Sequence, residues 1–121
     1  MQYTFRTIER AERAARCLPF RLDLFEAMRQ QGVPLKAVVG EQGVRKRYTK
    51  TPLAELAAED DLSWLIRVGV LRREVDGQGI TDAFRLTPLG HRLVEKWQCT
   101  GKIEAPTLPQ RLLDLLNRWL S

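Results

Sequence analysis

The pattern of apolar and polar positions is most regular between residues 68 and 97, where its period changes twice. An apolar helical pattern ends at Gly69, and glycine readily takes the left-handed conformation that closes a helix. Residues 70–75 and 80–86 can then run extended, separated by the turn DGQG at residues 76–79, whose two glycines tolerate positive φ values. The pattern predicts a helix that leads directly into a β-hairpin.

A further helix is predicted directly after the hairpin. Thr87 can cap it, and Pro88 suits its first position because the amide hydrogen that proline lacks would have no helical partner there. Four apolar residues recur on one face at helical spacing: Leu89, Leu93, Val94 and Trp97. Residues 98–108 include a glycine and a proline and are typical of a linker, after which Pro109 starts a final helix.

Amphipathic spacing also predicts four helices before the hairpin. The first covers residues 4–18, the second residues 19–31 and a short third residues 35–40. The Thr-Pro pair at residues 51–52 is typical of a helix cap and first turn, so a fourth helix should cover residues 53–68. A chain of 121 residues can bury an adequate core, and we expect one compact domain.

The hairpin and its flanks resemble the winged helix-turn-helix superfamily, in particular the MarR- and PadR-like bacterial regulators. The matching positions are Gly69, Leu71, Arg73, Asp76, Gly77, Gly79, Arg85, Leu86, Thr87, Pro88 and Gly90. The resemblance covers residues 19–97 and implies a mainly α fold with a small β-hairpin (α+β), flanked by extra N- and C-terminal helices. The whole chain is also similar to a small winged-helix family of cyanobacteria. Winged helices serve as DNA-binding and as protein-binding modules, so the resemblance specifies fold more than function.

The formal net charge of +5 is unevenly distributed. Residues 1–50 carry 11 Lys or Arg against 5 acidic residues, a balance of +6, whereas residues 51–121 carry 9 against 10, a balance of −1. The densest basic cluster is RKRYTK at residues 45–50. Basic proteins attract polyanions, so this distribution favours nucleic acid as the partner, although many small basic proteins bind none.

The resemblance assigns the recognition helix to residues 53–68, because that helix directly precedes the wing. The start of such a helix meets base edges in the major groove, while the wing contacts the backbone or the minor groove. We therefore expect a transcriptional regulator that binds double-stranded DNA. Phosphates would be bound by Arg45, Lys46, Arg47 and Lys50, the helix start would bring Tyr48, Thr49 and Thr51 to the groove, and the wing would contribute Arg73, Gln78 and Arg85.

Acidic residues in the predicted recognition helix oppose this assignment, because carboxylates repel phosphates. The helix has one basic residue, Arg67, against four acidic ones: Glu55, Glu59, Asp60 and Asp61. The first turn of one continuous helix can make the groove contacts alone, the segment can divide into two helices at Glu59, or the whole helix-turn-helix can lie within residues 51–71. The competing function is a winged-helix interaction module without DNA binding. RNA binding is a third alternative, but the few aromatic residues form no stacking array.

The hairpin arginines leave the same two functions open. They can contact phosphates, or they can pair across the strands with Glu74, Asp76 or Asp82. If the basic residues converge on one face and the acidic residues lie elsewhere, DNA binding is favoured. Interleaved acidic residues would favour the interaction module.

The final helix carries a wide apolar face that must be buried somewhere. Its residues are Leu112, Leu113, Leu116, Trp119 and Leu120, joined by Leu115. The helix can fold back as a lid on its own domain, pack against the N-terminal helix, or pair with a second copy. Terminal helices of the regulators that this chain resembles commonly dimerise, so the resemblance favours a homodimer with this interface.

Other classes of function find little support in the sequence. His91 is the single histidine, and no nucleophile motif or metal-ligand spacing is present, so we expect neither an enzyme nor a metal or cofactor. Cys17 and Cys99 lie far apart and outside any CxxC motif, and are expected to be reduced. No long apolar run and no secretory signal occur, which predicts a cytoplasmic protein without membrane contact.

Overall fold

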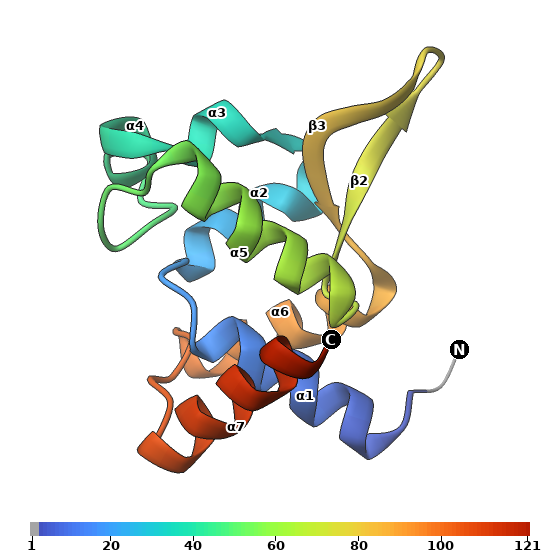
Figure 1. Ribbon diagram of the computed structural model, residues 1–121. Coiled ribbons are helices and arrows are strands. Elements are labelled where there is room, and N and C mark those ends of the chain that lie inside the picture. Colours follow the sequence, from blue (N-terminus) through green and yellow to red (C-terminus); the bar gives the residue numbers. More distant parts are fainter. Residues whose placement is uncertain (1–2) are drawn as a thin grey trace.

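The structure is a computed structural model that describes residues 3–121, with seven helices and three strands in that range (Figure 1). In chain order the elements are α1 (Phe5–Arg16), α2 (Leu22–Gln30), β1 (Val33–Pro34), α3 (Leu35–Val38), α4 (Gly40–Arg45), α5 (Glu55–Arg67), β2 (Leu71–Asp76), β3 (Gly79–Leu86), α6 (Pro88–Thr100) and α7 (Leu108–Leu120). The fold is mainly helical with a small antiparallel sheet, so the predicted α+β class is confirmed.

The predicted hairpin is present as β2 and β3. Leu71 pairs with Leu86 at its base, and the register shifts between Arg73 and Val75. The short strand β1 pairs with the other edge of β3, which gives the strand order β1-β3-β2. In Figure 1 the hairpin projects away from the helical body, and α7 lies at the opposite end of the molecule beside α1.

The core lies between α1, α2, α5, α6 and the base of the sheet. Its largest fully buried side chains include Phe20, Phe25, Trp64 and Phe84. Trp97 of α6 packs against Phe25 of α2, with 5.4 Å between ring centroids. The apolar face predicted for the helix after the hairpin is therefore turned inward.

Helix α2 begins at Leu22, three residues later than predicted. The preceding residues are extended, because they pair with the segment that follows α4. The amide of Arg21 donates to the Tyr48 carbonyl and the amide of Lys50 donates to the Pro19 carbonyl, each at 2.9 Å. This pairing joins the predicted start of a helix at residue 19 to the basic segment that precedes α5.

The predicted single helix at residues 35–40 is instead two short helices, α3 and α4. Gly40 begins α4 with φ of 65°, which a residue with a side chain rarely adopts. Gly43 lies inside α4, where a Cβ atom would collide with the Val38 carbonyl oxygen. The glycines in this segment permit a tight corner between the two helices.

Helix α5 begins at Glu55, so the prediction that Thr51 and Pro52 start this helix is wrong. The Leu53 carbonyl accepts a hydrogen bond of 2.8 Å from the amide of Gly40, which holds the segment before α5 against α4 in an extended conformation. The helix then continues without a break to Arg67. A division at Glu59 and a helix-turn-helix within residues 51–71 are both contradicted.

Helix α6 has the predicted cap. The Thr87 hydroxyl accepts from the amide of Gly90 at 3.1 Å, with Pro88 in the first turn of α6. Helix α6 continues to Thr100 and ends at Gly101, so the connection to α7 is shorter than expected. Helix α7 begins one residue before Pro109, at Leu108.

Candidate nucleic-acid interface

The hairpin arginines are engaged by neighbouring acidic residues. Arg73 lies 3.9 Å from Glu59 of α5, and its guanidinium packs over the Phe84 ring at 4.9 Å. Arg85 forms an ion pair of 3.4 Å with Glu74 on the facing strand. Both predicted wing arginines therefore have a carboxylate beside them, which weakens their attraction for phosphate.

The tip of the hairpin is polar and exposed. The Asp76 carboxylate accepts a hydrogen bond of 2.7 Å from the amide of Gln78, which orders the turn. The Gln78 side chain is exposed, as are the apolar side chains of Val75 and Ile80. The tip can thus approach a partner, and it offers no positive charge of its own.

The outer face of α5 is acidic and apolar. Glu55, Leu56 and Asp60 are exposed along it. Asp61 forms an ion pair of 3.0 Å with Arg118 of α7, and burial raises the pKa of Asp61 while the hydrogen bond and charge of Arg118 lower it. The helix assigned to base recognition therefore presents no basic residue near its start.

The basic cluster at residues 45–50 is only partly available. Arg45 closes α4, Arg47 has a φ of 63°, and both side chains are exposed, as is that of Lys46. Thr49, however, is 1% exposed, so its predicted contact with DNA is wrong. The Gly43 position, which lacks a side chain, leaves room for Thr49 to point inward.

The remaining predicted contacts of this segment are accessible. Lys50 and Thr51 are exposed, and Tyr48 is half-buried against the core. Because α5 starts four residues after Thr51, neither Tyr48 nor Thr51 belongs to the start of that helix. They lie on the connection between α4 and α5.

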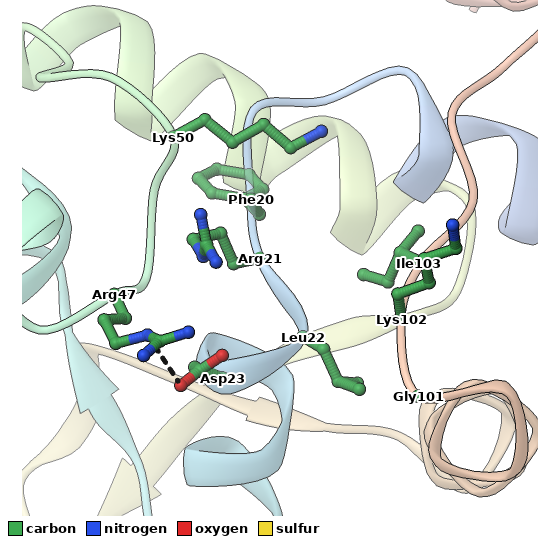
Figure 2. Close-up of a pocket in the computed structure, with 9 residues that line it drawn as sticks. All are labelled: Phe20, Arg21, Leu22, Asp23, Arg47, Lys50, Gly101, Lys102 and Ile103. Carbon is green, nitrogen blue, oxygen red and sulfur yellow. Dashed lines mark ion pairs between the residues drawn. The ribbon is translucent and has the colours of Figure 1, made fainter.

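Four basic side chains from three segments surround a hollow of about 240 Å³ beside this connection (Figure 2). They are Arg21, Arg47, Lys50 and Lys102. The hollow also has apolar lining from Phe20, Leu22 and Ile103. Figure 2 shows Arg21 between Arg47 and Lys50, with Lys102 on the opposite side of the hollow.

Most of the positive charge here has no acidic partner. Arg47 lies 3.7 Å from Asp23, which is the single carboxylate lining the hollow. Within residues 3–121, no ion pair joins Arg21, Lys50 or Lys102 to an acidic residue, and the same holds for Arg45 and Lys46. We call these five residues the unpaired basic surface.

Sequence reasoning missed Arg21 and Lys102. Arg21 reaches the cluster because residues 19–21 pair with residues 48–50, and Lys102 follows the end of α6. Arg73 and Arg85 remain apart from this surface, since Figure 1 shows α4 and the hairpin on different sides of the molecule. The predicted contacts thus form two groups, of which the hairpin group is interleaved with acidic residues.

The predicted dimer residues Leu112, Leu113, Leu116, Trp119 and Leu120 are all exposed on α7. The polar side of α7 faces α1 and α5 instead. Cys17, the C-cap of α1, is half-buried there, and burial raises the pKa of its thiol. Both cysteines are free thiols.

Among residues 3–121, no three His, Cys, Asp or Glu side chains are grouped so that they could hold a metal ion. Within the same range, every helix is too short or too polar to cross a lipid bilayer.

Residues 1–118 match the Npun_F0494-like family. Comparison with curated proteins and with solved structures gives no significant match.

Proposed function

We propose that this chain, which belongs to the Npun_F0494-like family, is a winged-helix protein that binds duplex DNA mainly through backbone phosphates. The order α2, β1, α3 and α4, α5, β2, β3 supports the winged-helix assignment, with β2 and β3 as the wing. The strand order β1-β3-β2 is compatible with it. A role in transcriptional control would place the protein in the cytoplasm.

The unpaired basic surface is the observation that carries this proposal. Arg45, Lys46 and Lys50 lie in one exposed segment of the chain, and Arg21 and Lys102 join Lys50 around the hollow. Cations without acidic partners attract a polyanion, and the release of the counterions condensed on DNA favours their binding. A row of backbone phosphates matches a surface that is exposed, positive and assembled from several segments.

Phosphate contacts suit this molecule better than base readout. Base readout needs a helix or strand that enters a groove with donors and acceptors for base edges. Helix α5 presents Glu55, Leu56 and Asp60 instead, and Glu59 is close to the wing residue Arg73. Binding through the basic surface alone would be weakly dependent on DNA sequence, since phosphates carry no sequence information directly.

A protein partner is the second candidate, favoured by the outer face of α5. Leu56 is exposed there between acidic residues, and the hairpin tip exposes Val75 and Ile80. Acidic residues interleaved with the wing arginines are the arrangement that favours an interaction module. This candidate predicts that DNA affinity is absent even at low salt.

A salt titration of binding to a random-sequence duplex distinguishes the two functions. Fluorescence anisotropy should give an affinity that falls steeply as salt rises. In the double variant Arg45→Ala/Lys46→Ala, the negative slope of log affinity against log salt should become less steep by about 0.9 for each phosphate that the variant no longer neutralises, or about 1.8 in all.

A matched control separates local contacts from net charge. Arg92→Ala/Arg111→Ala removes the same charge from exposed residues of α6 and α7, and its slope should equal that of the unmodified protein. Absence of binding at low salt would refute the DNA proposal. Equal slopes for the two double variants would reject residues 45–46 as the anchor.

A further inference from the structure

Helix α7 docks on the rest of the protein through its polar side. Asp114 is 6% exposed and accepts a hydrogen bond of 3.1 Å from the indole Nε1 of Trp64 in α5. One turn later, Arg118 donates to the Asp61 carboxylate at 3.0 Å. Two polar contacts therefore fix the helix on α5, and Asp114 is the one buried residue of α7.

The opposite side of α7 is apolar and faces solvent. Its side chains are between 44% and 82% exposed and comprise Leu108, Leu112, Leu113, Leu115, Leu116, Trp119 and Leu120. Four of them line an open apolar groove: Leu112, Leu115, Leu116 and Trp119. We call this surface the α7 face.

The size of the α7 face exceeds what an isolated monomer normally exposes. At about 100 Å² for each large apolar side chain, it amounts to roughly 700 Å². The largest apolar patch on a typical monomer is about 300–600 Å². A stable protein interface buries about 800 Å² on each partner, so the α7 face alone supplies most of one.

We propose that the α7 face binds the same face of a second copy of this chain, giving a two-fold homodimer. In such an interface each surface meets itself, so it must be self-complementary in charge. A groove beside Leu115 and Trp119 has one acidic residue, Asp60, and two basic residues, Arg67 and Arg118, in its lining. With Arg118 already paired to Asp61, Asp60 of one protomer is free to face Arg67 of its partner.

This mixed rim distinguishes a second copy from other occupants. A strongly acidic or strongly basic partner would meet like charge at one of the two rim positions, whereas the two-fold arrangement pairs Asp60 with Arg67 twice. The remaining exposed apolar side chains, such as Phe5, Leu56 and Ile80, lie on other elements and form no comparable face. The inference does not depend on DNA binding, because the α7 face shares no residue with the unpaired basic surface.

Oligomeric mass tests the proposal on the full-length chain. Sedimentation equilibrium or light scattering of the unmodified protein should give about twice the chain mass of 14.0 kDa. Leu112→Glu/Leu116→Glu places two charges in the centre of the α7 face and should give the monomer mass. Val75→Glu/Ile80→Glu also changes two exposed apolar residues to glutamate, on the hairpin tip, and should remain a dimer.

Circular dichroism should show that the α7 variant stays folded, since both leucines are exposed in the monomer. A monomeric mass for the unmodified protein at all concentrations would overturn the proposal and leave the face to a different protein. A dimer that persists in the folded Leu112→Glu/Leu116→Glu variant would overturn the assigned interface.

Charge reversal provides a test that leaves the apolar residues intact. Asp60→Arg alone and Arg67→Asp alone should each weaken the dimer, because each places like charges opposite one another. The double variant Asp60→Arg/Arg67→Asp should restore the unmodified dissociation constant. Weakening of the dimer in both single variants without restoration in the double variant would overturn the proposed pairing of the two protomers.

Discussion

Helices α6 and α7 resemble each other in sequence but use their apolar faces in opposite ways. Both have 13 residues, a threonine cap and a proline in the first turn. The apolar face of α6 is buried through Leu89, Leu93, Val94 and Trp97, whereas α7 buries only Asp114. The pattern of a helix thus predicts that an apolar face exists, and it does not specify what covers that face.

The surfaces that receive the two helices explain the difference. Helix α6 lies against α2, which offers the aromatic ring of Phe25 to Trp97. Helix α7 lies against α1 and α5, where the indole N–H of Trp64 and the carboxylate of Asp61 need polar partners. A buried donor or acceptor without a partner is costly, so these groups favour the polar side of α7.

Removal of one tryptophan from each helix is the strongest test of this comparison. Trp97 is 2% exposed and Trp119 is 82% exposed. Trp97→Ala should lower the free energy of unfolding by about 3–5 kcal/mol, because it leaves a large cavity in the core. Trp119→Ala should change the free energy of unfolding by less than about 0.5 kcal/mol. This substitution is made in the Leu112→Glu/Leu116→Glu background, which excludes effects on the dimer.

Urea unfolding followed by circular dichroism measures both values. Similar losses for the two substitutions would contradict the outward orientation of the α7 face. A large loss for Trp119→Ala in the monomer would mean that α7 turns its apolar side inward in solution.

Local signals in the sequence predicted part of this fold well. The hairpin followed from the turn glycines, and the start of α6 followed from Thr87 and Pro88, because these residues act within a few positions of themselves. The start of α5 was mispredicted although Thr51 and Pro52 have the local signature of a helix start. The hydrogen bond from Gly40 to the Leu53 carbonyl holds that segment extended, and no local pattern reveals a contact of this kind.

In the candidate site, too, local sequence signals did not reveal contacts that depend on the tertiary fold. Local charge density revealed the cluster at residues 45–50, but Arg21 and Lys102 join it only through the tertiary fold. The burial of Thr49 also depends on packing against α4, where Gly43 leaves the necessary space. Sequence reasoning therefore located the basic segment and did not define the surface.

Loss of the hydrogen bond between Asp114 of α7 and Trp64 of α5 should have an intermediate effect on stability. Asp114→Ala leaves the buried Nε1 of Trp64 without its acceptor, which should lower the free energy of unfolding by about 1–3 kcal/mol. Asp82→Ala removes an exposed aspartate of β3 as a control and should change it by less than about 0.5 kcal/mol. Equal effects in urea unfolding would show that the Asp114 contact does not hold α7 in place.

The smallest effect is expected from a substitution that keeps the hydrogen bond of Asp114 and removes its charge. Burial raises the pKa of Asp114, against the hydrogen bond from Trp64 and the charges of Arg118 and Arg13, which lower it. Because the folded state holds this proton more tightly than the unfolded state, the stabilisation is fully present below the ordinary value of 3.8 and is lost as pH rises through the folded-state pKa. Ionised Asp114 is therefore a net disadvantage at neutral pH.

Asp114→Asn retains an oxygen that can accept the bond from Trp64 and carries no charge. At about pH 7 this variant should be slightly more stable than the unmodified protein, and the difference should vanish below the ordinary pKa of 3.8, where Asp114 is protonated in both the folded and the unfolded state. Urea unfolding at both pH values, with Asp82→Asn as the control for an exposed charge, measures the difference. If Asp114→Asn instead destabilised the protein at neutral pH as much as Asp114→Ala does, the charge itself, through Arg118, would hold α7 with its polar side inward.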